Sequence, residues 1–118
     1  MIDKIHKKDT MQLYRHLKNS AVRRGIPFDI SITEFSNITI PISCPVLGIP
    51  LTYNDGKAKD NSISFDRIDS SKGYTFDNIV VVSNRVNKLK SNATFDEMKK
   101  IFEYYQELEK CQRHFSND

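Results

Sequence analysis

The segment SFDRIDSSKGYTFDNIVVVSNRVNKLKSN, residues 64–92, decides the fold of this 118-residue chain. Apolar and polar side chains alternate over 64–68, as in a half-buried strand, and 79–83 is rich in β-branched residues. A loop that contains Gly73 separates these two runs, and 84–92 is typical of a short helix. The segment therefore predicts two loop-linked strands followed by a helix.

The N-terminal third predicts a basic amphipathic helix over residues 9–24. Its apolar residues recur at helical spacing, and Gly25 and Pro27 end it. Basic side chains gather on and around this helix, namely Lys7, Lys8, Arg15, Lys18, Arg23 and Arg24. Such a helix is a candidate surface for a polyanion.

Between this helix and residues 64–92, the sequence predicts small elements. Ser31 and Glu34 have the spacing of a capping box, which opens a brief helix. Residues 44–51 place a tight turn between two apolar flanks, as in a small hairpin. Residues 54–62 are rich in Asn, Asp, Gly and Lys, and predict a solvated loop.

The C-terminal part predicts a longer helix over residues 94–114. Thr94 and Glu97 form its capping box. One face carries apolar residues at helical spacing, namely Met98, Ile101, Phe102, Tyr105 and Leu108. We expect this stripe to be a packing surface.

Composition bounds the class of protein. A chain of this length forms one domain, 1–118. The net charge of +3 is compatible with a nucleic-acid partner but does not establish one. No apolar run is long enough to cross a bilayer, and no leader segment is evident, so we expect no membrane partner and a cytoplasmic protein. The two cysteines, Cys44 and Cys111, are expected to be free thiols.

Polar residues stand at three joints of the 64–92 segment. Asp66 lies at the end of the first strand, Asn78 before the second, and Asn87 on the helix. Phosphodiester hydrolysis needs a hard cation held by oxygen ligands, activated water, and positive charge for the developing phosphorane. Carboxylate and amide oxygens suit Mg²⁺, so Asp66 and Asn87 could share one ion.

With these residues in place, the segments FDRID (65–69), GY (73–74), DNIV (77–80) and NKLKSN (87–92) resemble the core of HNH endonucleases, including small HNH-like proteins of phages. The resemblance implies an α+β fold with a ββα-metal core over 44–92. It also implies catalytic roles for Asp66, Arg67, Asn78 and Asn87, with Asp66 and Asn87 binding one Mg²⁺ or Mn²⁺ ion. Basic residues of the segment would contact nucleic acid, namely Lys72, Arg85, Lys88 and Lys90.

The main departure from the family is Arg67, which stands where HNH enzymes carry their histidine base. A guanidinium cannot accept a proton at neutral pH. Arg67 could instead bind the scissile phosphate, leaving water activation to the metal, Asp69 or Tyr74. Among the three histidines, His16 is the best candidate for a replacement base, although each is more simply an exposed residue.

A second departure concerns the two zinc knuckles of many HNH proteins, each a pair of cysteines separated by two residues. Cys44 is followed by Leu47 here, and Ser83 and Val86 occupy the second pair. One thiol does not hold structural zinc, so we expect none. Leu47 and Val86 are predicted to make an apolar contact in its place.

Three functions are compatible with these residues. The first is a metal-dependent HNH-type endonuclease that cuts double-stranded DNA in a bacterial or phage-infected cell. The second is a catalytically degenerate HNH-fold protein that binds nucleic acid without cutting it. The third is a phage protein-interaction factor that blocks a host enzyme. A chain this short has little surface for long-site recognition, which makes a homodimer a further expectation.

Overall fold

The computed structural model of the protein describes residues 2–4, 7–53 and 56–116, with side chains described over 9–53 and 56–112. It is a small α+β protein with four α-helices and three two-stranded sheets within that part of the chain. In chain order the elements are β1 (Ile2–Lys4), α1 (Lys7–Arg23), β2 (Phe28–Asp29), α2 (Ile32–Ser36), β3 (Thr39–Pro41), β4 (Ile63–Arg67), β5 (Tyr74–Thr75), the 3₁₀ turn η1 (Phe76–Asn78), β6 (Ile79–Ser83), α3 (Asn84–Lys90) and α4 (Phe95–Ser116).

The centre of the fold is the antiparallel pair β4–β6, which continues directly into α3. The register places Asp66 opposite Val80 and Ile63 opposite Ser83. Ser83 is also the N-cap of α3, since its hydroxyl accepts a hydrogen bond from the Val86 backbone N–H. The predicted order of two loop-linked strands and a helix is therefore confirmed.

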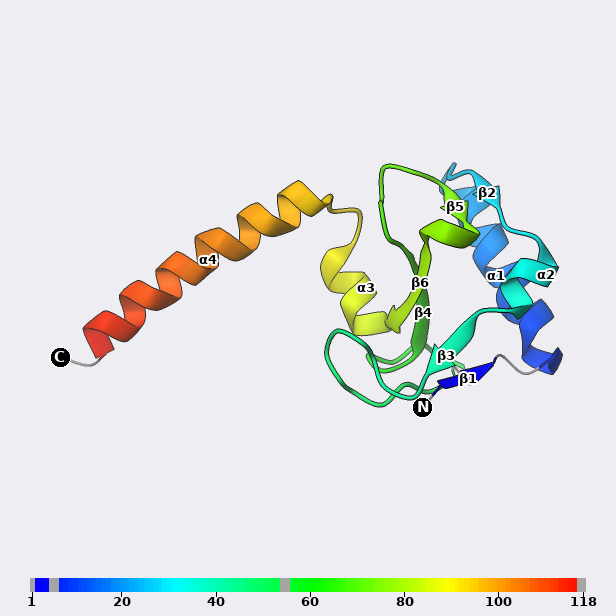
Figure 1. Cartoon of the computed structure of the whole chain (residues 1–118), viewed down its shortest axis with the longest axis horizontal. Coiled ribbons are helices and arrows are strands. Elements are labelled where there is room, and N and C mark those ends of the chain that lie inside the picture. The colour runs from blue at the N-terminus through cyan, green and yellow to red at the C-terminus, as the bar shows by residue number, and fades with distance from the viewer. Residues whose placement is uncertain (1, 5–6, 54–55, 117–118) are drawn as a thin grey trace.

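The β4–β6 pair separates two environments, with α1 on one side and α3 on the other (Figure 1). Phe65 and Val81 are buried in the apolar core, where Leu13, Tyr14 and Leu17 of α1 pack. Because successive strand side chains point to opposite faces, Ser64 and Asp66 of β4 face α3 instead. Strand alternation thus assigns one face to the core and the other to polar chemistry.

Aromatic rings fill much of the core between α1, α2 and the hairpin. The ring of Tyr14 contacts those of Phe28 and Phe35 edge-on, at centroid distances of 5.5 and 5.4 Å. Phe35 in turn lies 5.0 Å from Phe65 and is fully buried. Rings packed in this way stabilise a core by about 1 kcal/mol per pair beyond their buried area.

The connection between β4 and β6 is more ordered than the plain loop expected over 69–78. Tyr74 and Thr75 form β5, which pairs in parallel with β2. The Tyr74 N–H donates to the Pro27 carbonyl at 2.9 Å. A Cβ at Gly73 would lie 2.6 Å from that same carbonyl oxygen, so only glycine fits here. Local sequence did not reveal this pairing because its partner lies more than 40 residues away.

The tight turn predicted over 44–51 is present. Its flanks pair through an antiparallel bridge between Ser43 and Pro50. The turn brings Cys44 to the start of α3, where the Ser83 backbone N–H donates to Cys44 Sγ at 3.4 Å. The predicted contact between Leu47 and Val86 stays a prediction, and Leu47 is 47% exposed.

The stripe on α4 was predicted to be a packing surface, and within this chain that is wrong. The helix extends away from the rest of the protein (Figure 1). Ile101, Phe102, Tyr105 and Leu108 are all exposed, as is every residue over 99–112. Helical spacing shows that residues share a face, but it does not show what covers that face. Among the described residues, no helix is long and apolar enough to cross a membrane.

The thiol of Cys44 is expected to make the free energy of unfolding depend on pH. Burial alone would raise the pKa of its thiol, but hydrogen bonds from the Leu47 backbone and from the Ser83 hydroxyl and backbone outweigh burial. Together they lower the pKa from 9.0 to about 7. The unfolded chain then binds more protons between pH 7 and 9, so the free energy of unfolding should rise over that range. This contribution is lost as the pH falls through 7.

Urea unfolding at several pH values measures this effect. Cys44→Ser should flatten the rise between pH 7 and 9, since a hydroxyl does not titrate there. Cys111→Ser is the matched control, because Cys111 is exposed on α4. A slope that survives Cys44→Ser, or that disappears in Cys111→Ser, would contradict the assignment to Cys44.

Candidate functional site

A cleft of about 700 Å³ lies at the end of β4, between α3 and the C-terminal end of α1. Most of the residues that line it come from the 64–92 segment, and Arg24, Ile26 and Thr94 come from outside it. The lining includes Arg24, Asp66, Arg67, Tyr74, Asn87 and Lys88. The structure therefore brings the predicted metal ligands, Asp66 and Asn87, into one cleft.

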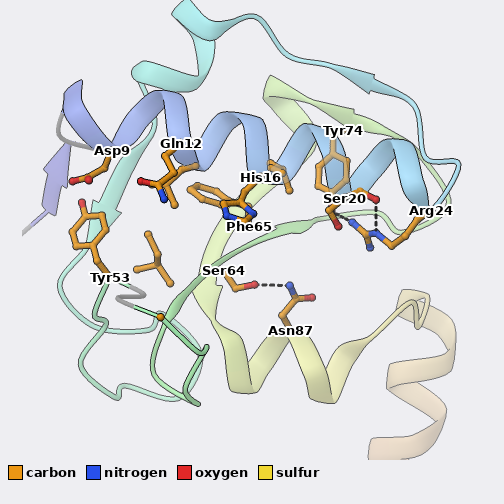
Figure 2. A pocket seen from close by; sticks show the side chains of 14 residues that line it. Asp9, Gln12, His16, Ser20, Arg24, Tyr53, Ser64, Phe65, Tyr74 and Asn87 are labelled. Atoms are coloured by element: carbon orange, nitrogen blue, oxygen red, sulfur yellow. Dashed lines mark hydrogen bonds between the residues drawn. The ribbon is translucent and has the colours of Figure 1, made fainter.

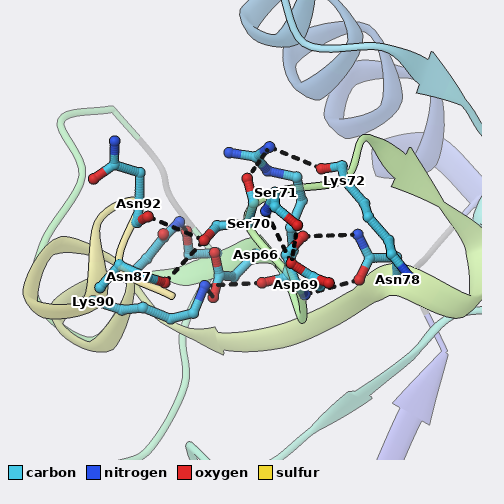
Figure 3. Close-up of polar contacts among 12 residues, drawn as sticks. Asp66, Asp69, Ser70, Ser71, Lys72, Asn78, Asn87, Lys90 and Asn92 are labelled. Carbon is cyan, nitrogen blue, oxygen red and sulfur yellow. Dashed lines mark hydrogen bonds and ion pairs between the residues drawn. The ribbon is translucent and has the colours of Figure 1, made fainter. Parts of the chain in front are cut away.

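Asp66 is nearly buried and is paired with a lysine of α3. Its Oδ2 lies 3.0 Å from Lys90 Nζ, and the two side chains are 10% and 12% exposed (Figure 3). Lys90 Nζ also donates to the Arg67 carbonyl at 2.9 Å. An ion pair removed from water is strong only when its remaining donors are satisfied, and this second bond helps to satisfy them. Lys90 therefore joins the end of α3 to the end of β4.

Asn87 approaches the same strand one turn earlier in α3. Its Nδ2 donates to the Ser64 hydroxyl at 2.6 Å. Its side-chain oxygen Oδ1 has no hydrogen-bond partner within the described part of the chain, and Asn87 lines the cleft. Asn87 is thus positioned by Ser64 with an acceptor available for a ligand.

Arg67 is held by the loop that follows its own strand. Its Nη1 donates to the carbonyls of Ser70 and Lys72, both at 2.9 Å. The Nε and Nη2 groups donate to none of the described residues, and Arg67 lines the cleft, so these donors remain available to a ligand there. A guanidinium fixed in this way is suited to binding a phosphate, and it is not a base.

Tyr74 brings a second arginine to the cleft. Its ring centroid lies 5.6 Å from the guanidinium carbon of Arg67 and 5.9 Å from that of Arg24. Arg24 Nη2 also donates to the Tyr74 hydroxyl at 2.8 Å. The sequence placed Arg24 on the basic helix but gave no sign that it reaches this site, because the contact depends on the pairing of β2 with β5.

Asn78 organises the loop and does not reach the cleft lining. Its Oδ1 accepts from the Asp69 N–H, and its Nδ2 donates to the carbonyls of Asp69 and Gly73, at 2.9, 3.2 and 2.8 Å (Figure 3). Asp69 in turn accepts from the Ser71 hydroxyl and backbone N–H, and these bonds lower the pKa of its carboxyl. The side chain of Asn78 is therefore fully used in fixing the loop.

The remaining basic residues predicted for nucleic-acid contact divide into two groups. Lys88 is exposed on α3 and lines the cleft. Lys72 and Arg85 are also exposed but are not among the residues that line it. Lys72 belongs to the loop that holds Arg67, through its backbone carbonyl, and Arg85 lies on α3.

A second cavity of about 620 Å³ lies between α1 and β4, and Figure 2 shows it from close by. It is lined by His16, Tyr53 and Ser64 among others, and it shares Arg24, Tyr74 and Asn87 with the cleft. His16 of α1 therefore lines a cavity that reaches Asn87. The sequence singled out His16 as the best candidate for a replacement base, because its basic helix was expected to pack beside the site, and that role stays a prediction.

The donors around Asp66 are a poor match for a divalent ion. Mg²⁺ prefers several oxygen ligands, and the cleft offers one carboxylate whose Oδ2 is paired with an ammonium group. The described residues contain no group of three or more His, Cys, Asp or Glu side chains that could hold a metal. Binding of Mg²⁺ or Mn²⁺ by Asp66 and Asn87 stays a prediction, and it would require displacement of Lys90.

Comparison with known proteins yields one distant relative. The chain is 28% identical over 83 residues to an uncharacterised 29.0 kDa protein from the dda-modA intergenic region of Enterobacteria phage T4. The match covers 70% of this chain and 32% of the relative, so the chain spans about a third of that protein's length. No family model and no solved structure matches the chain.

The role of Asn78 can be tested by Asn78→Asp. The substitution removes the N–H donors to the Asp69 and Gly73 carbonyls and places a carboxylate oxygen against them. We expect a loss of about 3 kcal/mol in the free energy of unfolding at pH 7, measured by urea denaturation. The loss should shrink below about pH 4, where the new carboxyl regains a proton to donate.

Asn92→Asp is the matched control for this substitution. The Asn92 side chain is exposed, and the substitution changes the charge of the protein by the same amount. Equal stabilities for Asn78→Asp and Asn92→Asp would contradict a structural role for Asn78.

Proposed function

We propose that this protein binds nucleic acid through the cleft at the end of β4, as a relative of HNH nucleases in which a lysine has taken the position of the catalytic cation. The observation that carries the proposal is the contact between Lys90 Nζ and Asp66 Oδ2 at 3.0 Å. The carboxylate expected to hold a metal is neutralised by the protein's own ammonium group. The proposal keeps the phosphate-binding side of such a fold without its hydrolysis.

The charges around the cleft support a polyanionic ligand. Arg24, Arg67 and Lys88 contribute three cations to its lining, and Asp66, its only acidic lining residue, is already paired. Arg67 has free N–H donors, and its plane is fixed by two backbone carbonyls. A guanidinium with fixed orientation binds a phosphate bidentately at a small cost in entropy.

Uncharged polar groups add to this surface. Asn84, Asn87 and Asn92 line the cleft together with serines of the β4–β6 loop. Amide and hydroxyl groups contact phosphate and sugar oxygens in protein complexes with nucleic acids. The combination favours recognition of the backbone, and it does not by itself imply preference for a base sequence.

The resemblance of residues 65–92 to the HNH core supports the proposal in a second way. The β4–β6–α3 order is the one the resemblance implies, and Asp66, Asn87 and Lys90 meet at its joints. Cys44 and Ser83 occupy the first positions of the two zinc knuckles of the family, and the Ser83 backbone N–H donates to Cys44 Sγ. Arg67 in place of the histidine base agrees with a protein that has kept the fold and lost the reaction.

Fluorescence anisotropy with short labelled DNA duplexes tests this proposal. The full chain should bind with an affinity that falls steeply with salt, and binding should need no divalent cation, so EDTA should leave it unchanged. Lys88→Ala should weaken binding roughly 3- to 10-fold and reduce the slope of log affinity against log salt by about 1. No resolved change in unfolding should accompany it, since Lys88 is exposed.

Lys99→Ala is the matched control, because it removes the same charge from an exposed position on α4. Equal losses in Lys88→Ala and Lys99→Ala would indicate attraction by total charge and would contradict binding at the cleft. Absence of binding to any nucleic acid at low salt would contradict the proposal as a whole, and would favour a protein-interaction factor.

Metal-dependent hydrolysis is the second candidate function, and one observation favours it. Asp66 and Asn87 line one cleft, and His16 lines a cavity that shares Asn87 with it. A carboxylate and an amide group thus line one cleft, and an imidazole lines the cavity that adjoins it. This set could support cutting of DNA if a divalent cation displaces Lys90.

Plasmid nicking with Mg²⁺ or Mn²⁺ tests this second candidate. If the protein is a nuclease, Asp66→Ala should abolish nicking, while Asp96→Ala on α4 should leave it unchanged. Nicking that survives Asp66→Ala would identify a contaminant or a different site. The binding proposal predicts that the unmodified chain leaves the plasmid intact while retarding it on a gel.

A further inference from the structure

Helix α4 exposes more apolar surface than an isolated helix of a folded protein normally does. Its large apolar side chains are between 43% and 66% exposed, namely Phe95, Ile101, Phe102, Tyr104, Tyr105 and Leu108. Side chains of this size present about 150–250 Å² each when fully exposed. The six together therefore leave on the order of 700 Å² in water, above the largest apolar patch typical of a monomer.

These residues lie on one side of α4, flanked by Glu97 and Glu109, and the other charged residues lie on the opposite side. Met98, Ile101, Tyr105 and Leu108 follow the alternating spacing of three and four residues that forms the seam of paired helices. On the opposite side, Lys100 pairs with Asp96 at 2.8 Å and Lys110 with Glu107 at 3.5 Å. The polar face thus carries ion pairs of its own, and the apolar face is left to a partner.

The charge of α4 argues against nucleic acid or a membrane as that partner. Over 95–112 the helix has five acidic residues and three lysines. A polyanion would be repelled, and helices that lie on membranes carry a polar face rich in Lys and Arg. The rest of the chain does not cover this face either, since the helix extends away from it (Figure 1). The chemistry left is another apolar protein surface.

We infer that α4 pairs with α4 of a second copy of this chain, apolar face to apolar face. Two such faces would bury on the order of 1,000–1,400 Å² in total, close to the area of stable specific interfaces. Central aromatic residues are typical of the side chains that dominate binding at such interfaces. Each chain presents the same surface, so a two-fold pairing satisfies both copies at once.

The test is the mass of the full chain in solution, measured by sedimentation equilibrium over about a hundredfold range of concentration. The unmodified chain should have twice the 13.7 kDa chain mass at the upper end and should dissociate on dilution. Ile101→Lys combined with Tyr105→Lys should make it a monomer throughout, because four charges would enter the paired face. The pairing of α4 does not involve the residues of the cleft. A result on DNA binding therefore neither supports nor contradicts it.

A matched control exchanges charge on the polar face of α4 through Lys99→Glu combined with Glu103→Lys. These residues are exposed and lie away from the seam, so the control should remain a dimer. A monomeric unmodified chain at the highest concentration would overturn the inference, and so would a dimer that persists in Ile101→Lys/Tyr105→Lys. Dissociation of the control as well would overturn the assignment to the apolar face.

Discussion

The contact between Lys90 and Asp66 connects the architecture of this protein to its chemistry. Lys90 is the last residue of α3, and Asp66 is the last but one of β4, so the pair joins the end of the helix to the end of the strand. The second bond of Lys90, to the Arg67 carbonyl, fixes the backbone from which the Arg67 side chain begins. The position of the cleft therefore depends on an ion pair that also occupies its only carboxylate.

Residues 64–92 carried enough local information to predict their own fold. Alternation defined β4, β-branched residues defined β6, and the polar joints indicated that Asp66 and Asn87 would approach each other. These signals worked because strand and helix periodicities are local, and because a hairpin followed at once by a helix has few ways to pack. What local signals could not supply was the partner of Asp66, since a lysine on an exposed helix face and a lysine under a carboxylate have the same sequence pattern.

The features that the sequence did not predict have different physical causes. The pairing of β2 with β5 brings Arg24 to the cleft, and no periodicity in either segment indicates it. The catalytic role that the resemblance gave to Asn78 stays a prediction, and the side-chain hydrogen bonds of Asn78 in the structure go to the loop. On α4 the stripe was recognised, but its burial was assumed. An amphipathic pattern gives the direction of an interface and leaves the identity of the other side open.

Tyr74 connects two separate parts of the chain at the cleft. Its ring holds a guanidinium from the end of α1 and another from the end of β4, and its backbone pairs with the strand after α1. A ligand that contacts both arginines is thus bound by two parts of the molecule that separate when the chain unfolds. Binding and folding are then thermodynamically linked, and the melting temperature of the whole domain becomes a gauge of how fully the cleft is occupied.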